Sequence, residues 1–119
     1  MKLKNYIAGQ WIEGSGEGIE ILNAVNGELV AISDTDGINF DEALHYGRTV
    51  GYKNLSKMTF YDRGEMLKKV ALYLLERKKK YYELSYKTGA THADSWVDIE
   101  GGFGTFFVYS GLAKRMLPN

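Results

Sequence analysis

The sequence contains no cysteine, and this absence excludes several kinds of site. Without thiols, the 119 residues can form no disulfide framework, no thiolate metal site and no cysteine nucleophile. Histidine is also scarce, because His45 and His92 lie far apart and neither has a second histidine three or four residues away. We therefore expect no metal site in this chain.

A surplus of charge and a long apolar run are missing as well. The 15 basic residues balance the 15 acidic ones, so the formal net charge is zero. Proteins that bind nucleic acids or anionic membranes usually carry a basic surplus, and we expect neither partner here. No segment approaches the roughly 18 apolar residues of a membrane span, and the first residues lack the apolar run of a signal peptide. These features predict a cytoplasmic protein.

Aromatic residues, in contrast, are abundant, with 9 Tyr, 5 Phe and 2 Trp. A chain this short can bury only a modest fraction of its surface. Some of these rings are therefore expected on a surface that another part of a larger protein covers.

The first third of the chain is predicted to be β-rich. A hairpin is expected around residues 8–10, a loop of the length that takes one residue at positive φ. Residues 19–22 and 28–33 are two further β-prone segments, and the Asn-Gly pair at 26–27 is the strongest turn signal in the chain. Residues 1–35 therefore predict a β ribbon, which needs a sheet or a helix to pack on.

The rest of the chain, residues 39–119, is predicted to be helical. Asn39, followed three residues later by Glu42, resembles a capping box and starts a helix over about 40–52. Apolar residues at i, i+3 and i+4 spacing predict a second helix over about 60–86, and Gly89 follows it as a C-cap.

A third helix is predicted from Thr91, which has Asp94 three residues on, to the basic pair Lys114 and Arg115. The local fold class is therefore α+β, with β-hairpins followed by three helices.

The middle of this third helix is unusually rich in small residues. Gly101, Gly102 and Gly104 each cost a helix interior about 1 kcal/mol relative to alanine. Gly101, Gly104 (or Thr105), Val108 and Gly111 fall roughly on one stripe. Either a neighbouring helix packs there at close range, or the stripe is the wall of a channel, and the residues alone leave both explanations open.

No set of side chains in the sequence forms a catalytic site. Asp94 and Asp98 could act as an acid/base pair or hold a hard cation, but acids near a helix N-terminus are usually solvated. Ser95 has no histidine placed to activate it. We predict no catalytic residue in this chain.

Three other features are predicted to be structural. The glycine loop at 14–18 lacks the lysine of a P-loop, so it is not expected to hold phosphate. The basic run at 77–80 is expected to be a solvated helix face. Four aromatic residues are expected in the core: Phe103, Phe106, Phe107 and Tyr109.

Several motifs together resemble one family. Residues 5–11, NYIAGQW, followed by Gly14, resemble the I-x-G-x-W hairpin that opens aldehyde dehydrogenases. Residues 23–31, NAVNGELVA, resemble their N-P-A-T-G-E-x-I-A strand pair, although the proline is missing. The string at 88–102, TGATHADSWVDIEGG, and the segment at 58–67 resemble the branch that degrades phenylacetate, in which a MaoC-like hot-dog hydratase is fused to the dehydrogenase.

This resemblance implies that residues 1–119 are the N-terminal portion of an aldehyde dehydrogenase domain with an α/β parent fold. The parent enzymes hydrolyse oxepin-CoA and oxidise 3-oxo-5,6-dehydrosuberyl-CoA semialdehyde with NADP, or with NAD. The cysteine nucleophile, the glutamate base, the main dinucleotide contacts and the hydratase are implied to lie later in such enzymes. This chain alone is therefore expected to bind no cofactor tightly.

The resemblance also implies partners and a substrate surface. The ribbon would join a bridging sheet in a homo-oligomer, and the helices would pack on the remainder of the dehydrogenase domain. Four residues would line the aldehyde channel: Val97, Gly101, Gly104 and Thr105. A glycine at 101 would widen that channel for a long CoA-bound semialdehyde. The alternative is a free-standing helical or α+β module that self-associates and has no catalytic activity.

Overall fold

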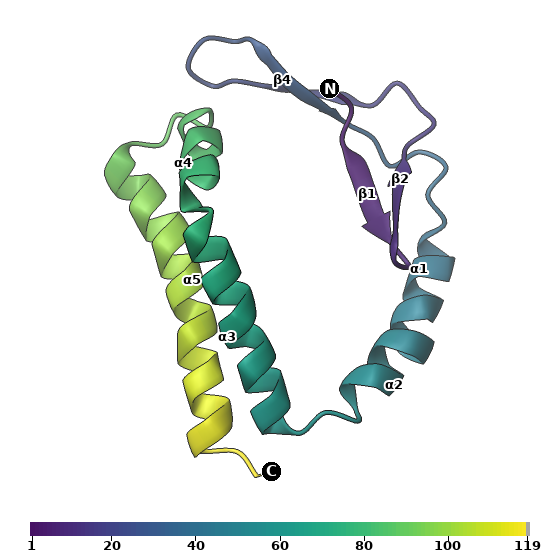
Figure 1. The fold of residues 1–119 in the computed structure, drawn as a ribbon. Coiled ribbons are helices and arrows are strands. Elements are labelled where there is room, and N and C mark those ends of the chain that lie inside the picture. The colour runs from purple at the N-terminus through teal and green to yellow at the C-terminus, as the bar shows by residue number, and fades with distance from the viewer. Residues whose placement is uncertain (119) are drawn as a thin grey trace. The chain divides into compact units, whose positions relative to one another are not determined.

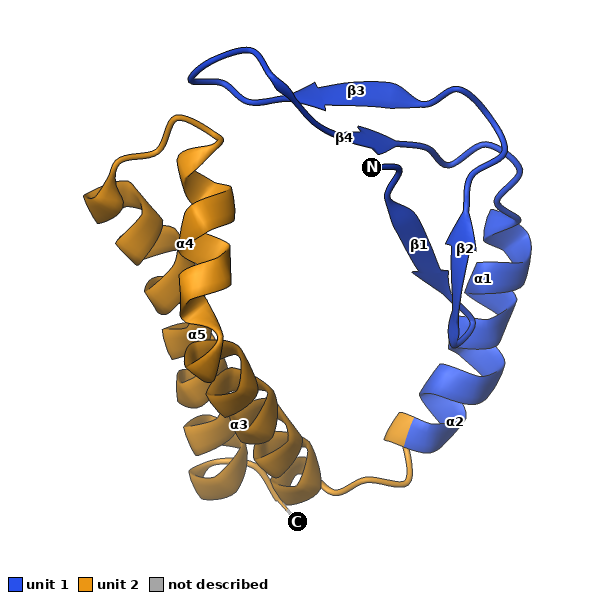
Figure 2. Cartoon of the chain, turned by 45° about the horizontal axis from the view of Figure 1, so that its top comes forward, with its two compact units in different colours: residues 1–54 blue, residues 55–119 orange. Residues whose placement is uncertain are grey.

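The computed structural model describes residues 1–118, in an α+β arrangement of short antiparallel strands followed by helices (Figure 1). The chain divides into two compact units, Met1–Asn54 and Leu55–Asn119 (Figure 2). Among the described residues, no helix has both the length and the apolar character needed to cross a bilayer.

The predicted first hairpin is confirmed in unit 1. Strand β1 (Lys4–Ile7) pairs with β2 (Gln10–Glu13), and Tyr6 lies opposite Trp11 with the ring centroids 5.1 Å apart. The predicted three-residue loop is wrong. Only Ala8 and Gly9 connect the strands, and both have positive φ, 51° and 84°. Two consecutive residues at positive φ are typical of a type I′ turn, whose twist matches that of the strands.

This turn makes Ala8 a position where a substitution should stabilise the protein. An alanine at positive φ is disfavoured because its Cβ crowds the backbone, whereas asparagine tolerates this conformation. We expect Ala8→Asn to raise the free energy of unfolding by about 0.5–1 kcal/mol, measured by urea denaturation. Ala8→Val is the matched control and should destabilise the protein; equal stability of both variants would contradict the type I′ assignment.

The second predicted strand pair is also confirmed. Strand β3 (Ile19–Leu22) pairs antiparallel with β4 (Leu29–Ser33), with a register shift between Ile21 and Leu22. The connection includes Gly27 at φ 73°, as its Asn-Gly turn signal predicts. The N-terminal segment adds a short parallel bridge, Lys2 to Ile32, on β4.

The predicted helix over 40–52 forms, but it is not a uniform α-helix. It consists of α1 (Phe40–Tyr46), a π-helical segment η1 (Gly47–Gly51) and α2 (Tyr52–Leu55). The Asn39 side chain accepts the N–H of Glu42 at 3.0 Å, so half of the expected capping box is present. The Thr49 hydroxyl donates to the carbonyl of His45, the acceptor that an α-helix would offer to the backbone, and this competition favours the wider turn.

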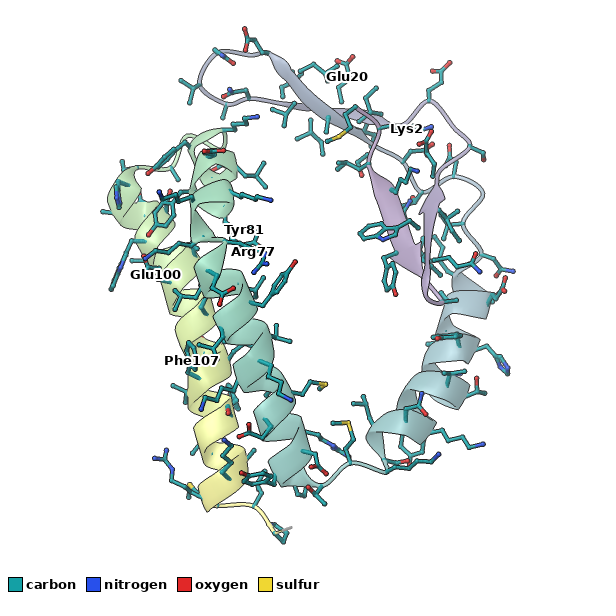
Figure 3. All side chains as sticks on the ribbon, in the orientation of Figure 1. Lys2, Glu20, Arg77, Tyr81, Glu100 and Phe107 are labelled. Carbon is teal, nitrogen blue, oxygen red and sulfur yellow. The ribbon has the colours of Figure 1, made fainter. Side chains whose placement is uncertain are left out.

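In unit 2, the predicted single helix over 60–86 is wrong, because the helix breaks at Arg77. Helix α3 (Phe60–Glu76) and helix α4 (Lys78–Tyr86) meet at this residue, which has φ −108° and ψ 10° (Figure 3). The Arg77 guanidinium donates to the carbonyl of Tyr73, four residues earlier, at 3.0 Å and lies 3.7 Å from the centre of that ring. The side chain thus takes the acceptor that the Arg77 N–H would use in a continuous helix.

The third predicted helix is confirmed as α5 (His92–Arg115). It packs along α3, and the closest approach is at Gly64, where an added Cβ would lie 3.0 Å from the Ser110 carbonyl oxygen and 3.1 Å from the Ala113 Cβ. Ala71 on α3 is also fully buried. The core of unit 2 is therefore narrow and built from small residues.

Candidate functional site

The candidate site lies on α5, whose start is fixed by a complete capping box. The Thr91 hydroxyl accepts the N–H of Asp94 at 3.2 Å, and the Asp94 carboxylate accepts the Thr91 N–H at 3.2 Å and its hydroxyl at 2.6 Å. These hydrogen bonds, chiefly the one from the Thr91 side chain, hold the pKa of Asp94 below its usual value. The side chains of Thr91 and Asp94 are therefore both occupied in capping the N-terminus of α5.

The glycines in the middle of α5 face open space. A Cβ added at Gly101, Gly102 or Gly104 would have no neighbouring atom within 4 Å. The glycine that permits close helix packing is Gly64 on α3 instead. The sequence leaves two explanations open for the small residues of α5: close packing of a helix, or the wall of a channel. No helix in the described part of this chain packs closely against these three glycines.

An apolar pocket of about 340 Å³ lies between α3 and α5. Its lining consists of Leu67, Gly102, Thr105, Phe106 and Tyr109. The Thr105 hydroxyl donates to a backbone carbonyl of its own helix at 3.1 Å, so this polar group is already partnered. The pocket offers contacts to apolar groups and very little hydrogen bonding.

Of the four residues predicted to line a channel, the structure brings Thr105 to this pocket. Val97, which is 61% exposed, Gly101 and Gly104 lie outside it, on the outward face of α5. That face separates the pocket from the flank of α5 that carries Glu100, because successive residues turn by about 100° around a helix. Val97 and Gly101, both exposed, thus form a strip beside the pocket with Gly104, which is half-buried.

The structure adds residues that the sequence analysis missed. Gly102 was placed off the small-residue stripe, yet it lines the pocket. Phe106 and Tyr109 were expected in the core. Phe106 is half-buried, whereas Tyr109 is 60% exposed, so the core assignment is wrong for Tyr109. Thr105, Phe106 and Tyr109 follow Gly102 by three, four and seven residues, which places them on one face of the helix. This spacing was the signal that could have identified them, whereas Leu67 comes from the facing helix.

A second group of polar side chains lies between α4 and α5. Glu100 accepts a hydrogen bond from Lys78 Nζ at 3.0 Å and another from the Tyr82 hydroxyl at 2.9 Å. The hydrogen bond from Lys78, followed by that from Tyr82, lowers the pKa of Glu100 below its usual value. The predicted solvated basic run is therefore only partly solvated, since Lys78 is held in an ion pair.

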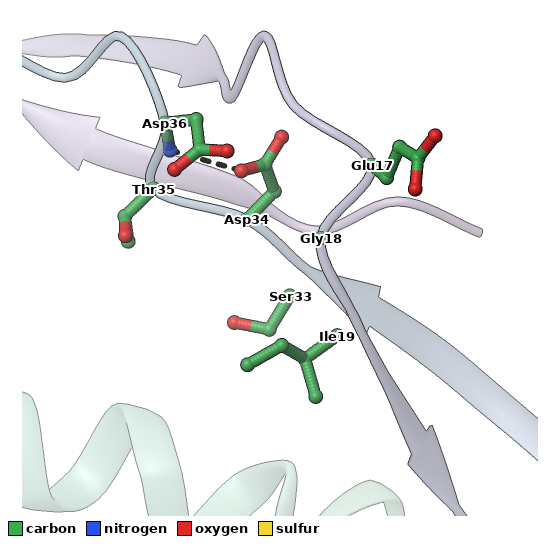
Figure 4. A pocket seen from close by; sticks show the side chains of 7 residues that line it. All are labelled: Glu17, Gly18, Ile19, Ser33, Asp34, Thr35 and Asp36. Atoms are coloured by element: carbon green, nitrogen blue, oxygen red, sulfur yellow. Dashed lines mark hydrogen bonds between the residues drawn. The ribbon is translucent and has the colours of Figure 1, made fainter.

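The glycine loop at 14–18 in unit 1 is closed by a carboxylate. The Asp34 carboxylate accepts the N–H of Gly16 at 2.8 Å. It also accepts the N–H of Asp36 at 2.9 Å (Figure 4). One backbone N–H of the loop that could donate to a phosphate is therefore already used within the protein. Within the described residues, no group of three acidic or histidine side chains is close enough to share a metal ion.

Comparison with known proteins identifies the family. The model of the aldehyde dehydrogenase family matches residues 11–119. The chain belongs to the aldehyde dehydrogenase family. It is 36% identical over 117 residues to a 3,4-dehydroadipyl-CoA semialdehyde dehydrogenase from Aromatoleum evansii, an alignment that covers 98% of this chain. The chain spans 23% of the length of that relative.

Membership of the aldehyde dehydrogenase family supports an oxidoreductase and the α/β fold of that family, in which the α+β arrangement seen here is one part. Aldehyde dehydrogenases use NAD or NADP as hydride acceptor. The described residues offer little of the chemistry that such an enzyme needs, because the sequence has no cysteine and the glycine loop is closed by Asp34. What α5 does offer is an open apolar surface.

Proposed function

We propose that this chain is the N-terminal portion of an NAD(P)-dependent aldehyde dehydrogenase that oxidises a CoA-linked semialdehyde. The observation that carries the substrate class is the 36% identity, over nearly the whole chain, to a CoA-semialdehyde dehydrogenase. The string at 88–102, which resembles the phenylacetate-degrading branch, supports the same class.

The string at 88–102 also suggests which CoA-linked semialdehyde is the substrate. We assign the substrate as 3-oxo-5,6-dehydrosuberyl-CoA semialdehyde in aerobic phenylacetate degradation, with NADP as the hydride acceptor. The complete enzyme is proposed to be a cytoplasmic homo-oligomer fused to a MaoC-like hydratase that hydrolyses oxepin-CoA. The smaller 3,4-dehydroadipyl-CoA semialdehyde is the competing substrate, since it is named for the relative.

The proposed contribution of this chain is one wall of the substrate channel. Val97, Gly101 and the half-buried Gly104 form a strip along α5, and Thr105 leads from it into the apolar pocket. A surface with little polarity suits the acyl chain of a CoA thioester. Glycines with open space above them leave room for a long substrate to pass.

The reactive groups are assigned to residues outside this chain. Asp94 and Glu100 are both engaged in hydrogen bonds that maintain the helices, and no cysteine is present to attack the aldehyde. The nucleophile, the general base and the main contacts to the dinucleotide therefore belong to the remainder of the domain. By itself, this chain is expected to show neither aldehyde oxidation nor hydratase turnover.

A substitution at Gly102 tests whether the apolar pocket beside α5 belongs to the substrate channel. In the complete enzyme, Gly102→Leu should fill the pocket and raise KM for the CoA-linked semialdehyde about tenfold, because the pocket no longer accommodates the acyl chain. The rate of NADPH formation is measured against substrate concentration. The matched substrate is acetaldehyde, whose KM should change by less than about twofold. An equal change in KM for both substrates would show that the acyl chain does not occupy the pocket.

A second candidate function is a self-associating module without catalytic activity. It is favoured by the large apolar side chains that stand in solvent, among them Trp11 at 68% and Trp96 at 55% exposure. Such surfaces are equally suited to burial under the rest of a dehydrogenase domain. Sedimentation velocity of the chain separates the cases: a mass that rises with protein concentration supports self-association, and a monomer at every concentration excludes it.

A further inference from the structure

We propose that the pocket between α4 and α5 binds the phosphoadenosine end of the CoA carrier. This inference rests on the proposed function in taking CoA as the source of that group. The pocket measures about 440 Å³, within the usual range for small-molecule sites. Its lining consists of Lys78, Lys79, Tyr82, Glu83, Tyr86, His92 and Glu100.

Aromatic rings form one side of this pocket. The His92 ring centroid lies 5.2 Å from that of Tyr82 and 6.5 Å from that of Tyr86, and the two tyrosine rings are 6.1 Å apart. Tyr86 is 40% exposed, so part of its ring remains open to a ligand. A purine base has a large π-face and stacks on such rings without needing a particular hydrogen-bond pattern.

Charged groups are arranged so that a cation remains available. The charge of Glu100 is balanced by Lys78 at 3.0 Å, and the Tyr82 hydroxyl donates a further hydrogen bond to it at 2.9 Å. Lys79 is exposed at the same pocket and forms no ion pair among the described residues, so its ammonium can bind a phosphate. The remaining carboxylate, Glu83, can accept hydrogen bonds from the adenine amino group or from ribose hydroxyls.

The pocket also lies where a CoA tail would reach from the proposed channel wall. Glu100 lines this pocket and Gly102 lines the apolar one, and they are about 200° apart around α5. The strip of Val97, Gly101 and Gly104 lies between these two flanks. Because the glycines carry no side chain, an extended pantetheine arm can cross the helix there.

The test uses adenosine 3′,5′-bisphosphate as the probe for this end of CoA. Titration of the chain, followed by NMR chemical shifts, should perturb the resonances of Lys79, Tyr86 and His92. Lys79→Gln should weaken binding about tenfold, because one charge-assisted hydrogen bond to phosphate is lost. Lys80→Gln is the matched control, since Lys80 is exposed on α4 and does not line the pocket, and it should change the affinity by less than about twofold.

A second variant keeps the proposal testable if a charge change alone has little effect. Tyr86→Ala removes the exposed ring and should also weaken binding about tenfold, while circular dichroism verifies that the helices remain. Adenosine 2′,5′-bisphosphate, which represents the corresponding end of NADP, serves as the second arm. Tighter binding of this compound would overturn the assignment to CoA.

Two results would overturn the site itself: no chemical-shift changes at these residues, or binding that neither Lys79→Gln nor Tyr86→Ala weakens relative to the Lys80→Gln control. Failure of nucleotide binding at this pocket would not disprove the proposed function. Oxidation of a CoA-linked semialdehyde by the complete enzyme is measured by NADPH formation and can succeed without this pocket. Failure of that reaction, with the nucleotide still bound, would leave the binding site in place.

Discussion

Gly64→Val is expected to destabilise unit 2 by about 2–3 kcal/mol. Even a Cβ at this position would lie 3.0 Å from the carbonyl oxygen of Ser110 and 3.1 Å from the Cβ of Ala113. The Ser110 oxygen belongs to the backbone of α5, so it cannot move aside as a flexible side chain would. The two added methyl groups of valine would therefore push α3 and α5 apart. Urea denaturation followed by circular dichroism measures the loss.

Gly102→Ala is the matched control for this prediction, because it also replaces a helical glycine. Nothing lies within 4 Å of a Cβ at Gly102. Alanine should therefore increase the free energy of unfolding by roughly 0.5–1 kcal/mol through its higher helix propensity. The two variants are expected to shift stability in opposite directions. A Gly64→Val protein as stable as the unmodified chain would contradict the close packing of α3 on α5.

Asp34→Asn is expected to cause the largest loss of stability of any single polar substitution in residues 1–54. The side chain of Asp34 is fully buried and pairs with Lys2 Nζ at 2.7 Å, while Lys2 also donates to the carbonyl of Gly14 at 2.9 Å. Its carboxylate accepts the N–H of Gly16 and of Asp36 as well. An amide would direct two hydrogens toward donors and remove the charge that faces Lys2, so buried partners would be left unsatisfied.

This contribution should depend on pH in a defined direction. The hydrogen bond from Lys2 above all, followed by those from the backbone, holds the pKa of Asp34 below its ordinary value of 3.8. A lowered pKa in the folded state means that the stabilisation is fully present above pH 3.8 and is lost as the pH falls through the folded-state pKa. The stability difference between the unmodified chain and Asp34→Asn should therefore be large at neutral pH and shrink in acid.

The control for the pH experiment is Asp36→Asn, which removes the same charge from the same loop. The backbone of Asp36 donates to Asp34, whereas its side chain is exposed. This substitution should change stability much less than Asp34→Asn, and urea denaturation over a pH series measures both. Equal effects of the two substitutions would show that Asp34 does not organise the loop.

Local chemistry explains why much of the fold could be predicted. The capping box at Thr91 depends only on residues three positions apart, and it forms. The turn at Gly27 follows from an equally local signal. Elements of this kind can be identified from sequence because the interactions that define them are contained in a few consecutive residues.

Other features depend on contacts that local patterns do not contain. The helix breaks at Arg77 without a proline or glycine that would predict a break. The cause is the Arg77 side chain, which donates to the carbonyl of Tyr73. Gly64 resembles any other helical glycine until Ser110 and Ala113 are brought against it. Asp34 likewise becomes important only when Lys2, far away in sequence, reaches its carboxylate.

The candidate site shows the same limit. The sequence predicts that α5 carries site residues, Thr105 among them, but it could not say which flank of the helix forms a pocket. Leu67 reaches that pocket from α3, and the inclusion of Gly102 and Tyr109 depends on how the two helices are rotated against each other. That rotation is fixed by the small residues at the packing contact and not by the residues that line the pocket.

We propose above that this chain belongs to an enzyme that oxidises a CoA-linked semialdehyde. The most direct measurement is the initial rate of NADPH formation by the complete enzyme that contains these residues, with 3-oxo-5,6-dehydrosuberyl-CoA semialdehyde and with its CoA-free counterpart as substrates. We expect rapid oxidation of the CoA-linked compound, with a kcat/KM at least about tenfold higher than that for the CoA-free compound. Absence of oxidation of the CoA-linked compound, or equal kcat/KM values for the two compounds, would contradict it.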